Sequence, residues 1–176
     1  MSEPRAPHPL IPYLEGLAKR EDRRALAMLR RSLSGDSVAS AYPFVAPFFP
    51  RERNAGFERA LLLVAGLFAL HPRSGTGSLG RALHVLAART KSESIESRFV
   101  ALLDARGEDL DEHLRHLVSL LRAHDVPVDW DDLLRAIRWW DSERSDAPRR
   151  WARDFWATAD AQGDENEADT HEGIES

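Results

Sequence analysis

The chain of 176 residues contains no cysteine and only two lysines. Without thiolates it forms no disulfide framework and no cysteine-ligated zinc site, and it has no cysteine nucleophile. No stretch approaches the roughly 18 uninterrupted apolar residues of a membrane span, and residues 1–10 lack the basic-then-apolar order of a signal peptide. We therefore expect a cytoplasmic protein that does not enter a membrane.

Alternation of polar and apolar residues with period two is also missing, whereas apolar residues recur at helical spacing nearly everywhere. This pattern predicts an all-α fold, a bundle of about eight or nine helices. Residues 55–70 are apolar almost all round, which predicts a central buried helix that ends at His71-Pro72. Three prolines within residues 41–50 exclude one continuous helix there and predict short turns.

The domain organisation is read from breaks in this pattern. We expect one helical domain over residues 1–159, with sub-bundles at roughly 8–72 and 78–159 separated near residues 72–77 and 125–128. Residues 160–176 carry seven acids and no Lys or Arg, and cannot bury enough apolar surface to order themselves. The sequence therefore predicts a disordered acidic tail over residues 160–176.

Several helix starts have a sequence signature. Ser78 and Asp129 each precede an apolar periodic segment as a capping residue does, and Pro148 suits the first turn of a last helix. Thr90–Glu93 has the spacing of a capping box, and Asp109 with Glu112 predicts the start of the next helix. These signals place the helix boundaries of the second half of the chain.

The positive charge is concentrated in the first 100 residues, although the net charge of the chain is −5. Residues 1–100 carry 15 Lys and Arg against 9 Asp and Glu. On the second predicted helix, which ends at Gly35, Leu26 and Leu29 face one side while Arg24 and Arg31 face the other. The pattern indicates a basic surface that suits a polyanion, although an Arg-rich composition also follows from a GC-rich genome.

Basic residues on successive predicted helices suggest a groove that follows a phosphate backbone. A single exposed arginine is usually only solvated or in a surface ion pair of little energetic value, so the interpretation depends on the number of arginines. The arginines of this proposed groove are Arg30, Arg31, Arg59, Arg81, Arg98 and Arg115.

Two catalytic interpretations are weaker than their structural alternatives. Residues 75–80 match the dinucleotide-binding pattern G-x-G-x-x-G, but a helix rather than a strand is predicted before them, which favours a plain loop. His113 and His116 lie one helical turn apart beside Glu112, but the H-E-x-x-H arrangement and a third ligand are missing. The acids at 129, 131 and 132 are explained by helix capping. We expect no catalytic residues, no metal and no cofactor.

All five tryptophans lie in the last third of the chain, where core packing is the default role of an indole. Trp139 and Trp140 are adjacent and point about 100° apart on a helix, so both cannot face one small core equally well. We therefore take Trp139 and Trp140 as candidate residues of a subunit interface. An alternative function follows, a helical protein-interaction module in which the arginines only solvate the surface.

Several short segments of the sequence, taken together, resemble one known family. Segments 29–33, 78–83, 96–103, 113–118, 128–130 and 149–155, with Trp139-Trp140 and the aromatic segment 42–48, occur in the same order in the CasB-type small subunit of the type I-E CRISPR Cascade complex. The similarity extends over roughly residues 10–157. The order and spacing of these segments together carry the resemblance.

The resemblance implies an all-helical, non-catalytic subunit of the RNA-guided surveillance complex in antiviral defence. Its implied partners are crRNA and target DNA, the other Cascade subunits, and a second copy of itself. Such a subunit contacts the nucleic-acid backbone and stabilises the R-loop, including the displaced strand. Its contacts need no sequence specificity, because base pairing between guide RNA and target DNA supplies it.

Carried over by position, the resemblance assigns nucleic-acid contacts to Arg31, Arg81, Arg98 and Arg115, with Arg30 beside them. The basic position at the start of the central helix falls near Arg53 or Arg51. Further candidates are Lys19, Arg20, Arg24, Arg149 and Arg150. The acidic tail has no counterpart in the family pattern, and it is expected to compete with nucleic acid for the basic surface.

Overall fold

The computed structural model describes residues 5–35 and 37–157, and within these ranges the chain is helical without a named strand. The predicted all-α fold of eight or nine helices is confirmed. The predicted tail, residues 160–176, lies outside the described residues.

The α-helices are α1 (Leu10–Lys19), α2 (Arg23–Arg31), α3 (Tyr42–Val45), α4 (Ala55–Leu70), α5 (Leu79–Thr90), α6 (Glu93–Asp104), α7 (Gly107–Ala123), α8 (Trp130–Trp139) and α9 (Ala147–Trp156). Short 3-10 turns flank α3, namely η1 (Ser32–Ser34), η2 (Val38–Ala41) and η3 (Ala46–Phe48).

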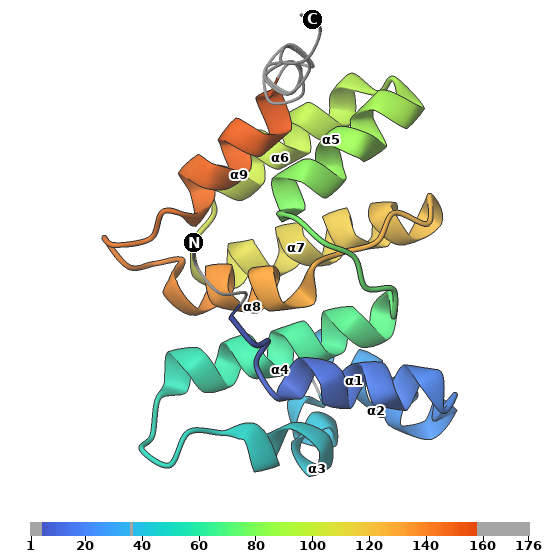
Figure 1. The fold of residues 1–176 in the computed structure, drawn as a ribbon. Helices are drawn as coiled ribbons and strands as arrows, with labels where there is room; N and C mark the ends of the chain where they lie inside the picture. Colours follow the sequence, from blue (N-terminus) through green and yellow to red (C-terminus); the bar gives the residue numbers. More distant parts are fainter. Residues whose placement is uncertain (1–4, 36, 158–176) are drawn as a thin grey trace, which may run out of the picture.

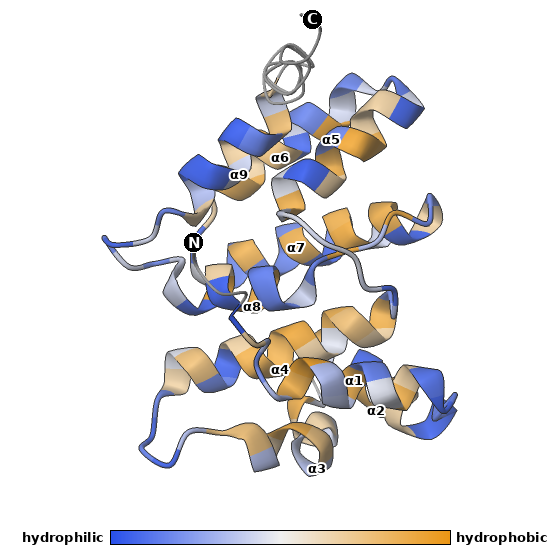
Figure 2. Ribbon diagram, in the orientation of Figure 1, coloured by the Kyte–Doolittle hydropathy of each residue, from blue (hydrophilic) through white to orange (hydrophobic). Residues whose placement is uncertain are grey.

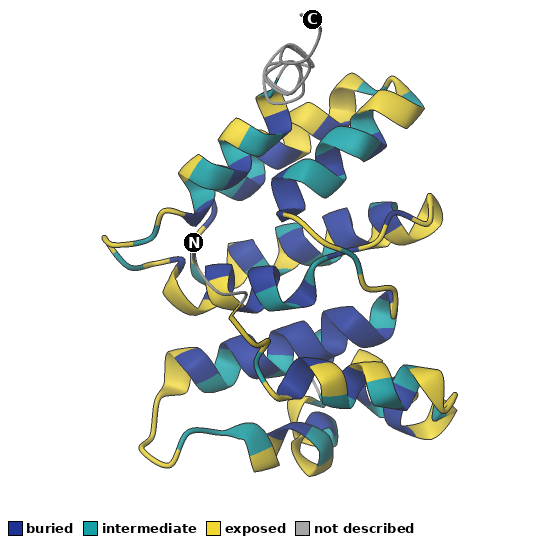
Figure 3. Cartoon of the chain, in the orientation of Figure 1, coloured by how far each residue is buried: buried dark blue, intermediate teal, exposed yellow. Residues whose placement is uncertain are grey.

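Helix α4 is the axis of the core, as its sequence predicts. The side chain of Asn54 accepts a hydrogen bond from the Phe57 amide at 3.0 Å and starts the helix, and His71 ends it. Helices α1, α2 and α3 cover one side of α4, while α7 and α8 cover the other, with α5, α6 and α9 beyond them (Figure 1). Because α4 is enclosed from both sides, it is the most continuously apolar and buried helix (Figures 2 and 3).

The two segments predicted to separate the sub-bundles lie side by side. The Gly75 amide donates to the Val128 carbonyl at 2.9 Å, and the Val128 amide donates to the Arg73 carbonyl at 3.2 Å. A ring nitrogen of the buried His71 lies 2.7 Å from the Val126 carbonyl oxygen. One hydrophobic core nevertheless runs through all the long helices. The division into sub-bundles at residues 8–72 and 78–159 therefore stays a prediction.

The helix starts test the capping predictions individually. Ser78 caps α5 by accepting from the Arg81 amide at 3.2 Å, Asp129 caps α8 by accepting from the Asp132 amide at 2.9 Å, and Pro148 lies in the first turn of α9. The capping box at Thr90–Glu93 is wrong, because α5 continues through Thr90, whose hydroxyl donates back to the Leu86 carbonyl. The start at Asp109 is also wrong, since α7 begins two residues earlier at Gly107.

Candidate nucleic-acid interface

The first third of the molecule presents positive charge that no carboxylate neutralises. Between residues 5 and 54 the structure describes nine Lys and Arg side chains, all exposed. None of them lies within ion-pair distance of an acid in the described part of the chain. This set contains the following predicted residues: Lys19, Arg20, Arg24, Arg30, Arg31, Arg51 and Arg53.

Arg30 and Arg31 lie at the end of α2, next to the end of α4, and Arg115 reaches from the middle of α7 to η1, which directly follows α2. Arg30 donates from Nη1 to the Ala69 carbonyl at 3.3 Å, and Arg115 donates from Nη1 to the Leu33 carbonyl at 3.3 Å. These carbonyls lie at helix C-termini, where cations are favoured, but each carries only a partial negative charge. The contacts orient the two guanidiniums and leave most of their positive charge available.

Arg59, another of the predicted nucleic-acid contacts, is paired within the protein. From α4 it forms an ion pair with Asp111 on α7, and it donates to the Gly107 carbonyl at 2.7 Å. Burial raises the pKa of Asp111 above its ordinary value, and the positive charge of Arg59 opposes this rise. Arg59 therefore links two core helices, and much of its hydrogen-bonding capacity is occupied.

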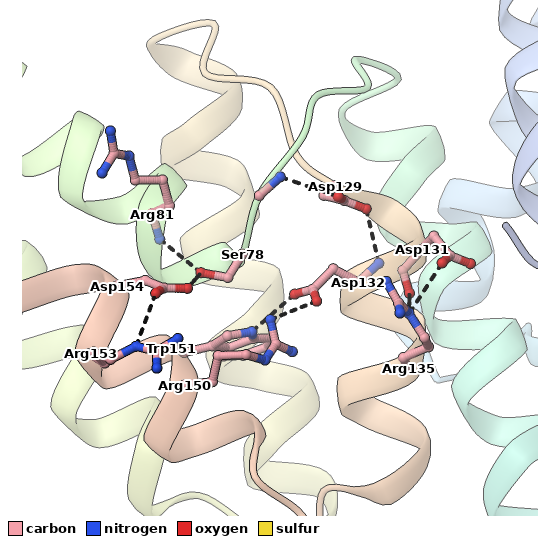
Figure 4. Close-up of polar contacts among 11 residues, drawn as sticks. Ser78, Arg81, Asp129, Asp131, Asp132, Arg135, Arg150, Trp151, Arg153 and Asp154 are labelled. Carbon is pink, nitrogen blue, oxygen red and sulfur yellow. Dashed lines mark hydrogen bonds and ion pairs between the residues drawn. The ribbon is translucent and has the colours of Figure 1, made fainter. Parts of the chain in front are cut away.

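Arg150 is likewise engaged inside the protein, in a polar network between α5, α8 and α9 (Figure 4). Its Nη1 lies 2.7 Å from Asp132, and the Trp151 indole N–H donates to the same carboxylate at 3.1 Å. Burial raises the pKa of Asp132, and the charge of Arg150 and the hydrogen bond from Trp151 oppose this. This pair holds α9 against α8.

Arg81 lies half-buried at the start of α5, beside the same network. The Ser78 hydroxyl, which caps α5, donates to Asp154 of α9 at 2.6 Å (Figure 4). Arg98 on α6 and Arg149 on α9 are exposed and have no ion pair among the described residues. Because α5, α6 and α9 lie beyond α7 and α8 as seen from α2 (Figure 1), the single groove that would join all these arginines stays a prediction.

The two adjacent tryptophans have opposite environments. Trp140 is only 2% exposed, packs on Trp151 with ring centroids 5.1 Å apart, and donates its indole N–H to the Ala105 carbonyl at 2.9 Å. Its side chain is therefore part of the core of this chain and offers no surface to a partner. Trp139 is 54% exposed. Of the two predicted interface residues, only Trp139 presents its ring to the surroundings.

The glycine pattern at residues 75–80 is explained by packing. Helix α4 precedes it in place of the strand that a dinucleotide site needs. A Cβ atom on Gly80 would collide with the backbone of Trp151, and one on Gly75 would lie 2.8 Å from Pro127. Gly77 has a φ of +98°, which favours glycine. These glycines allow close approach of chain segments.

Neither a metal site nor a membrane span is found in the part of the chain that the structure describes. His113 and His116 belong to no cluster of three potential ligands there. No described helix has both the length and the apolar composition that crossing a bilayer requires.

Comparison with known proteins decides the family. A model of the family CRISPR-associated protein Cse2 matches residues 25–156. The chain belongs to the Cse2 family. A Cse2 protein of Thermus thermophilus is 38% identical over 138 residues, covering 75% of this chain and 78% of the relative. The predicted kinship with CasB-type subunits is confirmed.

Two solved structures of this kind are similar in fold. The crystal structure of CasB from Thermus thermophilus matches with a TM-score of 0.73 and 31% identity, covering 85% of this chain and 96% of that one. A chain in the structure of a CRISPR RNA-guided surveillance complex matches with a TM-score of 0.71 and 25% identity, covering 90% and 95% respectively. The similarity in fold therefore extends over most of this chain.

The sequence did not single out Arg138, although it belongs to an aromatic contact. Its guanidinium lies over the Phe57 ring, 4.0 Å from the centroid, and over the Trp139 ring at 4.9 Å. A cation beside an exposed indole was the only local signal for this contact. Phe57 is far away in the sequence, so nothing in the pattern indicated the second ring.

Proposed function

We propose that this Cse2-family chain is the small subunit of a type I-E CRISPR Cascade complex, with a binding role and no catalysis. In this role it contacts the backbone of crRNA and target DNA without sequence specificity and stabilises the displaced strand of the R-loop. Its partners are the other Cascade subunits and a second copy of itself, in the cytoplasm. The similar chain in an RNA-guided surveillance complex supports the assembly part of this proposal.

The observation that carries the nucleic-acid part is the unneutralised charge of the N-terminal region. Exposed guanidiniums without carboxylate partners keep their charge for a ligand, and each phosphate that they contact releases counterions. Guanidinium also forms two parallel hydrogen bonds with a phosphate, which lysine cannot do. The cluster of Arg30, Arg31 and Arg115 is the best oriented part of this surface, because backbone carbonyls fix two of its three side chains.

The experiment is a fluorescence anisotropy titration of the full chain with single-stranded DNA, duplex DNA and RNA at several salt concentrations. We expect log affinity to fall linearly with log salt concentration for the wild type. The triple variant Arg30→Gln, Arg31→Gln, Arg115→Gln should bind more weakly, with a salt slope smaller by about 0.7 for each lost contact to a single strand. Glutamine is polar and uncharged, and the Ala69 and Leu33 carbonyls each lose only one long hydrogen bond in a partly buried position, so the fold should tolerate the change.

Arg122→Gln is the matched single control, because Arg122 is exposed near the end of the same helix as Arg115 and was not predicted to bind. Its affinity should equal that of the wild type. Thermal unfolding midpoints first check that all variants are folded. Equal affinities of the triple variant and the wild type would contradict this interface. If the free chain binds nothing, the same variants are compared in the assembled complex with its target DNA, and a lack of effect there rejects the proposal.

A further inference from the structure

Trp139 differs from the other four tryptophans in its hydrogen bonding. The indole N–H groups of Trp130, Trp140, Trp151 and Trp156 donate to Arg73, Ala105, Asp132 and Glu96 respectively. The N–H of Trp139 has no acceptor within the described residues, and its side chain is the most exposed of the five. An exposed indole without a partner is free to contact a ligand.

The orientation of this indole is nevertheless fixed. The guanidinium of Arg138 lies over the Trp139 ring and also over the ring of Phe57, which is buried at the start of α4. Cation–π contacts of this kind contribute about 0.5–1 kcal/mol or more each. Trp139 is therefore held at the surface as a flat, oriented platform.

A cavity of about 650 Å³ lies beside this platform, between α8, the connection over residues 141–146 and the first turn of α9. Two of its lining side chains have no hydrogen bond or ion pair in the described part of the chain. The Ser145 hydroxyl is buried without a hydrogen bond, and the Arg144 guanidinium has no ion pair. Their positions are set by the backbone, since the Ser145 amide donates to the Ser142 carbonyl at 2.9 Å.

The cavity thus combines an aromatic surface, a hydroxyl and an unpaired cation. An aromatic side chain stacks on any nucleobase, and a guanidinium beside it can receive the phosphate of the same nucleotide. An apolar peptide side chain would use the indole but would leave both Arg144 and the Ser145 hydroxyl without a partner. The cavity also has two acids, Asp132 and Asp146, against three arginines, Arg135, Arg144 and Arg150. Asp132 is already paired with Arg150, so the acids do not outweigh the cations.

We propose that this cavity holds one unstacked nucleotide of a single strand, with its base on Trp139 and its phosphate at Arg144. The inference rests on the proposed function and extends it from backbone contacts to a site that holds a base without reading its identity. Such a site should give the chain a higher affinity for single strands than for duplexes, whose bases are already stacked on one another.

The test compares a single strand with an abasic strand of the same length, which keeps every phosphate but has no bases to stack. Affinities are measured by anisotropy for wild type, Trp139→Leu and Trp139→Phe. We expect the wild type to bind the normal strand about tenfold more tightly than the abasic one, in the range of one stacked base. Trp139→Leu should lose this preference without weaker binding to the abasic strand, and Trp139→Phe should keep most of it.

Two further variants separate the parts of the site. Arg144→Gln should weaken binding to both strands and lower the salt slope by about 0.7, because it removes a phosphate contact and no stacking. Trp156→Leu is the control, since Trp156 is 44% exposed at the other end of α9 and its N–H is paired with Glu96. It should bind both strands as the wild type does.

The outcomes distinguish this inference from the proposed function. Tight, salt-dependent binding that is equal for normal and abasic strands overturns the nucleotide site and supports the backbone contacts. If Trp139→Leu leaves both affinities unchanged but prevents copurification with the other Cascade subunits, the cavity is a protein contact and the inference is wrong. If neither the free chain nor the assembled complex binds either strand, both the proposed function and this inference are wrong.

Discussion

The arginines before α4 differ from those from α4 onward in their ion pairing. Before α4, described cations have no acidic partner. From α4 onward, arginines pair with carboxylates repeatedly, in Arg59–Asp111, Arg73–Asp125, Arg106–Asp141, Arg135–Asp131, Arg150–Asp132 and Arg153–Asp154. Among the described residues, ion pairs of arginine are thus confined to the part from α4 onward, and there a paired arginine such as Arg150 lies beside an unpaired one such as Arg149.

The difference shows that arginine content alone does not locate an interface. Arg59 and Arg115 both belong to the predicted groove and both approach α7 or lie on it, yet Arg59 is bound to Asp111 while Arg115 contacts only a carbonyl. A paired guanidinium must lose its carboxylate before it binds a phosphate, and that exchange leaves a half-buried acid uncompensated. Unpaired arginines carry no such cost.

The largest expected effect comes from disrupting the packing of α5 against α9 at Gly80, in the part of the chain from α4 onward. In Gly80→Ala the new methyl group would collide with the backbone of Trp151, which cannot move as a side chain can. We expect a loss of about 3 kcal/mol of unfolding free energy, at the upper end for overpacking. Thermal or urea unfolding measures it. Gly56→Ala, at an open helical position in α4, should instead stabilise by about 0.5–1 kcal/mol.

The neighbours Arg149 and Arg150 give the sharpest test of paired against unpaired arginine. Arg150→Gln leaves the buried Asp132 without its cation, and we expect a loss of about 2 kcal/mol, less than for a fully buried pair because the Arg150 side chain is 31% exposed. Arg149→Gln should change stability by no more than about 0.5 kcal/mol, since Arg149 is exposed and unpaired. Denaturant unfolding of both variants checks this.

The pH dependence of Arg150→Gln has a defined sign. Burial already raises the pKa of Asp132, and loss of Arg150 raises it further. The folded state then holds a proton that the unfolded state releases, so stability falls as the pH rises from about 3.8 through the folded-state pKa. The variant should therefore lie further below the wild type at neutral pH than in acid. A constant difference at all pH values would show that Asp132 is not the group involved.

A smaller effect is expected from removing the negative charge of residues 160–176. Replacing the seven acids of this segment with Asn and Gln keeps the length of the chain and takes its net charge from −5 to +2. Affinity for single-stranded DNA should rise by roughly threefold to tenfold at low salt, because repulsion of the polyanion is removed. The gain should vanish at high salt, where the Debye length is short. A gain that persists there would contradict an electrostatic role.

The sequence predicted the features that depend on neighbouring residues. The caps at Ser78 and Asp129 act on amides three residues later, and the course of α4 follows from the nearly continuous apolar run within its 16 residues. The wrong starts at Thr90 and Asp109 are local errors of a few residues, where several Ser, Thr and Asp side chains compete for the capping position.

The site was less predictable, because its decisive contacts are long-range. Whether Arg59 is free or paired depends on Asp111, and whether Trp139 or Trp140 is buried depends on Ala105 and Trp151. Nothing in a helical pattern specifies such partners, since periodicity assigns a face but not the residue that meets it. The two arginine classes of this chain therefore become visible only in the fold.

The smallest expected effect concerns His8, which ties the N-terminal region to α8. Its amide donates to Asp131 at 2.8 Å, its Nδ1 accepts from the Leu10 amide at 3.2 Å, and its ring contacts Phe57 edge-on. Burial lowers the pKa of His8, while the charge of Asp131 acts in the opposite direction. As the pH falls below about 6.5, His8 takes up a proton in the unfolded state before it does so in the folded state. The contribution of neutral His8 to stability is therefore complete above that pH and is lost on acidification.

His8→Asn keeps an acceptor for Leu10 and cannot titrate, so its unfolding midpoint should fall less than that of the wild type between neutral pH and about pH 5. Parallel thermal unfolding of the two proteins measures this difference, and equal decreases would show that His8 does not couple the two regions to pH.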